Sequence, residues 1–69
     1  MNRLEITLSK ALPFVGGDIY LLAIIVAKRA EQIANGDEPM VSENEIKDYK
    51  PADIALLELS KGLLEYDVA

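Results

Sequence analysis

The sequence predicts a small all-α domain of three to four helices. Apolar residues recur at helical spacing in three segments, and helix-capping or helix-stopping residues stand at the ends of those segments. The 69 residues are enough for one domain, 1–69, and 51% of them are apolar, so a core can form but is marginal at this size. Within this domain we expect an N-terminal segment, 1–15, and a frayed tail, 65–69.

The first expected helix covers residues 4–12, where leucines recur every four residues. Pro13 keeps this helix short or kinks it, because proline lacks the N–H that an interior helical position donates. The pair Gly16-Gly17 then predicts a turn.

The second expected helix, residues 18–34, has the clearest boundaries. Asp18 is a favourable N-cap, and Asn35-Gly36 supplies a C-terminal stop. Its first half is apolar on nearly every face, and such a helix is normally buried all round. Two short neighbouring helices cannot cover every side, so we expect an exposed apolar patch of the kind that marks interaction sites.

Small side chains form a stripe along this helix, at intervals of 4, 3 and 4 residues: Ala23, Ala27, Ala30 and Ala34. Such a stripe permits close approach of another helix. Packing against the third helix of the same chain is the favoured interpretation, and a groove that receives another chain is the alternative.

Residues 37–49 are mostly polar and are expected to form a loop. Ser42-x-x-Glu45 has the form of a capping box, which predicts a helical turn near residues 42–48. The third helix is expected over 51–64, because Pro51 suits the first helical position. Gly62 is either its stop or a tolerated late glycine.

The composition argues against chemistry at a site of its own. The chain has no His and no Cys, so it lacks the usual metal ligands, any disulfide and a histidine base, and we expect no catalytic residue, no metal and no cofactor. Its formal charge is −5, which disfavours direct nucleic-acid binding. The longest apolar run, residues 19–27, is too short to span a bilayer, and the absence of Cys fits the cytoplasm.

A row of apolar side chains on the central helix, Ile19, Leu22 and Val26, continues into Arg29. Arginine can lay its stem over an apolar face and fork its guanidinium onto a carboxylate or backbone carbonyls. We therefore expect this row and Arg29 to face a partner, with a smaller part for Lys28. On this basis Arg29→Ala should weaken assembly and leave the helix content of the isolated chain unchanged.

Four short motifs stand in one order, and together they resemble the omega subunit of bacterial RNA polymerase over residues 16–64. They are Gly17-Asp18-Ile19-Tyr20-Leu21-Leu22, Ala27-Lys28-Arg29-Ala30-x-Gln32, Gly36-x-x-Pro39-x-Val41 and Lys50-Pro51-x-x-Ile54-Ala55-Leu56-x-Glu58-x-x-x-Gly62. The family usually has Arg before the aromatic residue at the start of the second helix, where this chain has Ile19. A contact made by that Arg is absent or replaced here.

The resemblance implies a non-catalytic subunit that latches the beta-prime subunit and promotes assembly and stability of the polymerase core. It implies that the partner-binding residues are Ile19, Leu22, Val26, Lys28, Arg29 and Gln32. In some bacteria the N-terminus of omega also helps to form a guanosine tetraphosphate site, for which Arg3 is the candidate here. The alternative to this function is a free-standing, acidic helical interaction module that forms a homodimer.

Overall fold

The computed structural model describes residues 3–64, and of Arg3 and Leu4 it describes the backbone alone. Within that range no strand occurs, and the predicted all-α class is confirmed. The fraying expected of 65–69 lies outside the described residues. The elements in chain order are α1 (Arg3–Ala11), the 3-10 helix η1 (Leu12–Val15), α2 (Ile19–Ala34) and α3 (Pro51–Ser60).

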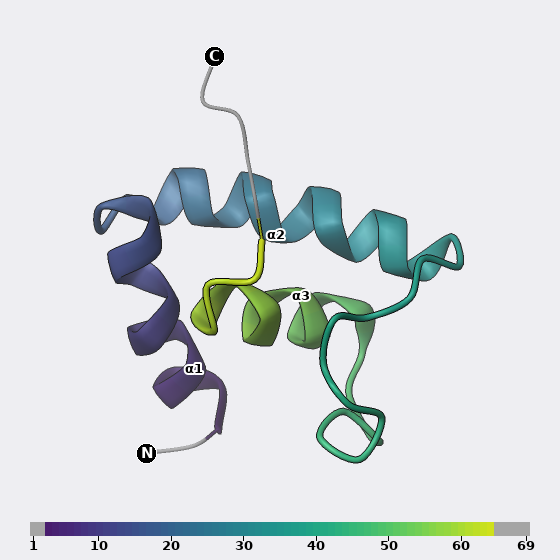
Figure 1. Ribbon diagram of the computed structural model, residues 1–69. Coiled ribbons are helices and arrows are strands. Elements are labelled where there is room, and N and C mark those ends of the chain that lie inside the picture. Colours follow the sequence, from purple (N-terminus) through teal and green to yellow (C-terminus); the bar gives the residue numbers. More distant parts are fainter. Residues whose placement is uncertain (1–2, 65–69) are drawn as a thin grey trace.

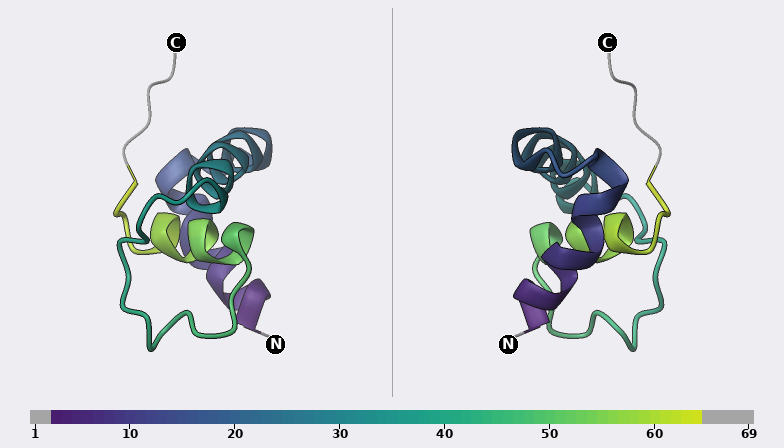
Figure 2. Two further views of the ribbon diagram at one scale, coloured as in Figure 1. Left: turned by 90° about the vertical axis from the view of Figure 1, so that its right-hand side faces the viewer. Right: turned by 90° about the vertical axis from the view of Figure 1, so that its left-hand side faces the viewer.

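Helices α2 and α3 lie side by side and run in opposite directions (Figure 1). Helix α1 lies across one end of this pair, and the connection 35–50 lies at the other end. The chain bends by 106° between Glu5–Val15 and Ile19–Ala34. Because of this bend α1 passes beside α3, as the two end-on views of Figure 2 show.

The first helix ends as Pro13 requires. Helix α1 stops at Ala11, and Pro13 lies in the first turn of η1, where a missing N–H costs little. The 3-10 helix then ends at Gly16, whose φ of 63° lies in the left-handed region. The N–H of Gly17 donates to the carbonyl of Leu12 at 2.9 Å, which closes the turn predicted at this glycine pair.

Helix α2 has the predicted caps. The Asp18 Oδ1 accepts hydrogen bonds from the N–H groups of Tyr20 at 3.0 Å and Leu21 at 3.1 Å. At the other end Gly36 has a φ of 110°, and the N–H of Asp37 donates to the carbonyl of Gln32 at 3.0 Å. Both boundaries are therefore set by local sequence.

Helix α3 begins at Pro51 as predicted but ends at Ser60, so the expected extension to residue 64 is wrong. Gly62, with a φ of 70°, is the stop. Its N–H donates to the carbonyl of Leu59 at 3.0 Å, and the N–H of Leu63 donates to the carbonyl of Glu58 at 3.0 Å. This is the paired pattern of a Schellman motif, which turns the chain away from the helix axis.

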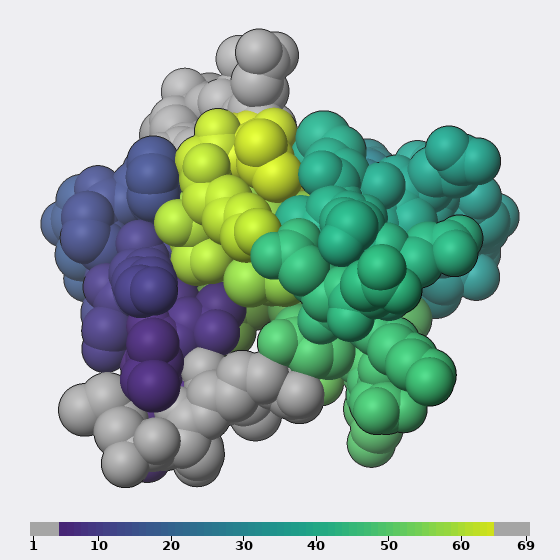
Figure 3. All heavy atoms as spheres, turned by 60° about the horizontal axis from the view of Figure 1, so that its bottom comes forward, coloured from purple at the N-terminus to yellow at the C-terminus, as the bar shows by residue number. Residues whose placement is uncertain are grey.

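The connection between α2 and α3 contains turns and no helix. Where a helical turn was expected, near 42–48, the structure has turns only. The N–H of Glu45 donates to the carbonyl of Ser42 at 3.0 Å, and Ile46 is buried. Figure 3 shows the connection (teal) beside the residues that follow α3 (yellow). An ion pair between Lys61 Nζ and Glu45 Oε1, 2.5 Å apart, links the two segments.

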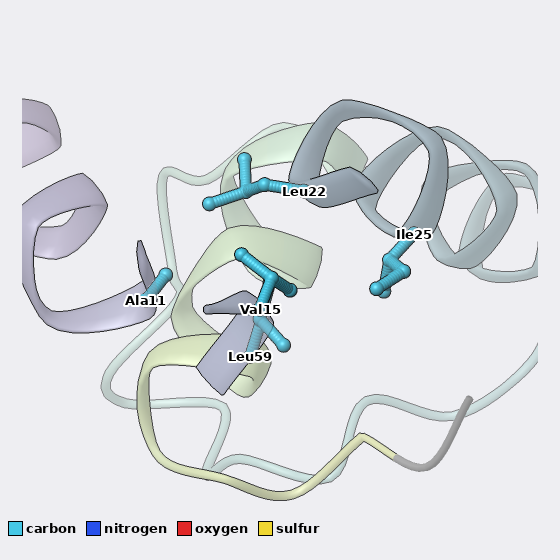
Figure 4. Close-up of a cluster of buried hydrophobic side chains, with 5 residues drawn as sticks. All are labelled: Ala11, Val15, Leu22, Ile25 and Leu59. Carbon is cyan, nitrogen blue, oxygen red and sulfur yellow. The ribbon is translucent and has the colours of Figure 1, made fainter. Parts of the chain in front are cut away.

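The core lies where the four elements meet. Its buried cluster takes one or two side chains from each of them, drawn in Figure 4: Ala11, Val15, Leu22, Ile25 and Leu59. Half-buried apolar side chains, among them Val26 and Leu56, pack around it. This cluster fixes which face of α2 points inward, and hence which face is exposed.

A buried ion pair and the open face of the central helix

The most buried charged group among the described residues is the carboxylate of Glu58. Its side chain is 0% exposed, and that of Arg29 is 13% exposed. Arg29 Nε donates to Glu58 Oε1 at 2.7 Å, and Arg29 Nη2 donates to Glu58 Oε2 at 3.0 Å. Two parallel N–H to oxygen bonds form the fork that a planar guanidinium makes with a carboxylate. The pair joins the second half of α2 to α3.

The same pair also forms hydrogen bonds to the backbone of the connection 35–50. Glu58 Oε2 accepts a further hydrogen bond from the backbone N–H of Met40, at 2.7 Å. Arg29 Nη2 donates to the backbone carbonyl of Glu38 at 3.0 Å, and Arg29 Nη1 donates to Gln32 Oε1 at 3.3 Å. Most of the five N–H donors of the guanidinium therefore bind acceptors of the same chain.

Electrostatics keep Arg29 charged. The hydrogen bonding that the Arg29 guanidinium donates to the Glu58 carboxylate raises the pKa of Arg29, and the negative charges of Glu58 and Asp37 act in the same direction. Burial of Arg29 opposes them, because it penalises the charged form, but it does not reverse the direction. A charged pair in this position is costly to break, since removal of one partner leaves an uncompensated buried charge.

The predicted partner-binding residues do not share one surface. Leu22 is buried in the core, Val26 is half-buried against it, and Arg29 is bound to Glu58. Ile19, Lys28 and Gln32 are exposed. No contact with another chain is present to test any of the six as a partner contact, so each stays a prediction, as does the role of Arg3.

Sequence reasoning missed the internal partner of Arg29. The signal lay in the third helix, where Glu58 is the one charged residue in the otherwise apolar run 54–59. A carboxylate on an apolar helix face needs a cation when that face is buried. Arg29 forks onto a carboxylate and also binds one backbone carbonyl, but both belong to its own chain; a role of Arg29 toward a partner stays a prediction.

The outer face of α2 points away from the core. It carries large apolar side chains in its first half, where Tyr20 is 81% exposed, Ile24 is 55% exposed and Ile19 is 48% exposed. Three alanines of the small-residue stripe are exposed as well, so the expected packing of the stripe against α3 is wrong for Ala23, Ala27 and Ala34. We call Ile19, Tyr20, Ala23, Ile24, Ala27 and Lys28 the outer face.

The described residues offer neither a metal site nor a single membrane-spanning helix. Among residues 3–64, no group of three or more His, Cys, Asp or Glu side chains is placed to hold a metal ion. No single helix in that range is long and apolar enough to cross a membrane, although the bent pair Glu5–Val15 and Ile19–Ala34 has the necessary length and composition when taken together.

The fold and the ion pair thus define a small all-helical protein with an internal clasp and one open apolar helix face. The family model described as RNA polymerase Rpb6 matches residues 16–66. The chain is 53% identical over 66 residues to the DNA-directed RNA polymerase subunit omega of a Nitratiruptor species, an alignment that covers 96% of this chain and 93% of that protein.

Two further relatives carry the same name. The chain is 49% identical over 61 residues to subunit omega of Campylobacter jejuni subsp. jejuni serotype O:23/36, covering 88% of this chain and 81% of that protein. It is 50% identical over 60 residues to that of Campylobacter concisus, covering 87% and 83%. No solved structure matches significantly. The chain belongs to the RNA polymerase omega (Rpb6) family, and the resemblance read from its four motifs is confirmed.

Proposed function

We propose that this chain is a non-catalytic accessory subunit of bacterial RNA polymerase, which latches the beta-prime subunit and promotes assembly and stability of the core enzyme. The observation that carries the proposal is the 53% identity to an omega subunit over 96% of the chain. The chain acts in the cytoplasm, with the polymerase, and its contribution there is binding.

The outer face of α2 is the surface that we assign to the polymerase. More than half of the surface of Tyr20 and of Ile24 is exposed within residues 3–64, and the exposed Ala23 and Ala27 let another backbone come close. Exposed apolar surface of this kind is typical of a binding site rather than of a free surface. The partner would bury these side chains against apolar groups of its own.

The residues predicted from sequence divide into two roles in this proposal. Ile19, Lys28 and Gln32 are exposed and can touch beta-prime directly, although Gln32 Oε1 also accepts a hydrogen bond from Arg29. Leu22, Val26 and Arg29 have internal partners and act by setting the position of α2. Lys28 is the cation available on this face, because it has no ion-pair partner among residues 3–64.

The physical benefit of such a latch is entropic. Binding that orders a mobile segment of beta-prime incurs part of the conformational cost of assembly before the later subunits join. A small chain with a preformed binding face can do this at low cost to itself, since its own core already fixes α2.

The experiment uses purified core polymerase that lacks this subunit. The full chain, with a photo-reactive amino acid in place of Ile24, is bound to the core and irradiated, and the cross-linked subunit is identified by mass spectrometry. A matched variant carries the same group in place of Ile6, which is exposed on α1. We expect beta-prime to be cross-linked from position 24 in higher yield than from position 6.

Two results would contradict the proposal. A chain that does not bind the core enzyme at all, and that cross-links position 24 to a second copy of itself, would be a free-standing homodimeric module. A chain that binds the core but cross-links to a different subunit would be an accessory subunit without the beta-prime latch.

A further inference from the structure

We infer that Glu58 is a positioning residue, whose buried carboxylate holds the segment 38–40 against α2 and α3 in the free chain. A partner then meets a connection that is already in place, and not one that becomes ordered on binding. The inference concerns the chain by itself, so it stands or falls independently of the proposed partner.

The first observation is that the ion pair forms hydrogen bonds to the backbone of the connection between α2 and α3. The connection 35–50 has no helix or strand of its own, yet two consecutive peptide groups near its start are bound to the ion pair. The carbonyl of Glu38 accepts from Arg29, and the N–H of Met40 donates to Glu58. One donor and one acceptor fix both the position and the direction of the segment.

The second observation is that both oxygens of the Glu58 carboxylate accept hydrogen bonds, three in all. Glu58 Oε1 accepts from Arg29 Nε, and Oε2 accepts from both Arg29 Nη2 and the N–H of Met40. No buried side-chain polar atom among the described residues lacks a hydrogen-bond partner. The site is therefore a closed network, which fixes one geometry more sharply than a single bond would.

The third argument is energetic. A buried ion pair is weak evidence for stability, because apolar residues of similar volume often replace such a pair at no cost. An apolar pair between α2 and α3 could not bind the N–H of Met40 or the carbonyl of Glu38. What Arg29 and Glu58 supply beyond packing is a hold on the backbone of the connection.

The test is amide hydrogen exchange of the full, free chain, followed by NMR. In the parent chain we expect the Met40 amide to exchange at least about tenfold more slowly than an unstructured peptide of the same sequence, a factor that corresponds to ~1.4 kcal/mol. In Glu58→Gln, which keeps the size of the side chain, Met40 should exchange at least tenfold faster than in the parent. The amides of Ile25 and Val26 in α2 should accelerate by a smaller factor.

The matched control is Glu45→Gln, which removes an exposed carboxylate from the same connection and should leave Met40 exchange unchanged. The inference is overturned if Met40 exchanges at the unstructured rate in the parent. It is also overturned if Glu58→Gln speeds Met40 and the α2 amides by the same factor, because Glu58 would then contribute only to global stability.

A second variant serves if Glu58→Gln does not fold. Chemical synthesis can replace the amide between Pro39 and Met40 by an ester, which removes the N–H and leaves Arg29 and Glu58 intact. We expect unchanged helix content and at least tenfold faster exchange of the Ile46 amide, whose N–H donates to the carbonyl of Glu43 at 3.3 Å within the same connection. Unchanged exchange at Ile46 would overturn the inference.

Discussion

Gly62 lies against the ring of Phe14. A Cβ added at Gly62 would be 2.9 Å from Phe14 Cε1 and 3.1 Å from Phe14 Cζ, and the φ of Gly62 is +70°. Two demands meet at one position: the backbone must turn out of α3 in a left-handed conformation, and the turn must pass close to a side chain of η1.

Gly62→Ala should therefore destabilise the fold. A residue with a Cβ costs about 1–2 kcal/mol at this φ, and the contact with Phe14 adds to that cost. The ring is partly exposed and can move, which limits the addition. In a domain of this size, 1 kcal/mol lowers Tm by about 4–8 °C, and thermal unfolding followed by circular dichroism measures it.

Gly17→Ala is the matched control, because Gly17 has a φ of +77° and nothing within 4 Å of an added Cβ. It should carry the backbone cost alone. Equal losses in the two variants would mean that the Phe14 ring yields freely to the added methyl group.

Arg29→Ala should unfold the isolated chain or come close to it. Sequence reasoning alone expects unchanged helix content, but the buried carboxylate of Glu58 leads us to expect the opposite. Breaking a buried pair by removing one partner costs about 3–5 kcal/mol, which is comparable with the whole stability of a domain of this length. Urea unfolding measures the loss.

The double variant Arg29→Met with Glu58→Leu tests the reason for that loss. It leaves no unpaired charge, so most of the stability lost in Arg29→Ala should return. If the double variant is as unstable as the single one, the cause is lost packing and not the uncompensated Glu58.

Ile24→Asp should weaken binding to the polymerase core without unfolding the chain. Ile24 is 55% exposed, so a surface substitution there should change the free energy of unfolding by no more than about 0.5 kcal/mol. Removal of an apolar anchor in a binding face costs about 1.4 kcal/mol or more, which is a tenfold loss of affinity. Fluorescence titration with core enzyme measures it, and Ile6→Asp on α1 is the control.

The ion pair between Glu45 and Lys61 should make a small, pH-dependent contribution to stability. The hydrogen bond from Lys61 lowers the pKa of the Glu45 carboxyl below its ordinary value, with the Ser42 backbone acting in the same direction. A carboxyl whose folded pKa is lowered stabilises the fold above its unfolded pKa, and this contribution is lost as the pH falls through the folded pKa.

The measurement compares the parent with Lys61→Met by urea unfolding. The difference should be present at about pH 7, shrink with added salt, and vanish in acid below the pKa of Glu45. Lys47→Met, in the same connection, should show no such pattern. A difference that is independent of pH would assign the role of Lys61 to packing of its stem.

The parts of the fold that the sequence predicts are those that neighbouring residues decide. Asp18 caps α2 through bonds two and three residues away, and Gly36 ends it in the same local way. The end of α3 was ambiguous from sequence, because a glycine late in a helix can be tolerated. The structure resolves it through the φ of Gly62 and the place of Phe14, which comes from a distant element.

The candidate site was harder to predict, since it depends on contacts across the chain. Helical spacing places Ile19, Leu22, Val26 and Arg29 in one row, but it does not say whether the row faces α3 or a partner. The structure turns Leu22, Val26 and Arg29 inward and leaves Ile19 exposed, together with Tyr20 and Ile24. The partner of Arg29 lies 29 residues away at Glu58, beyond the reach of any local pattern.

The hydrogen-bond network around Glu58 also limits which substitutions can be accepted during evolution. The guanidinium of Arg29 serves a carboxylate, a backbone carbonyl and an amide at once, and a lysine cannot reproduce that planar fork. A change at either residue of the pair is therefore harmful until the other changes too. Positions 29 and 58 should be inherited as a unit among relatives, while Tyr20 and Ile24, which are exposed on the outer face of α2, can vary without disturbing the pair.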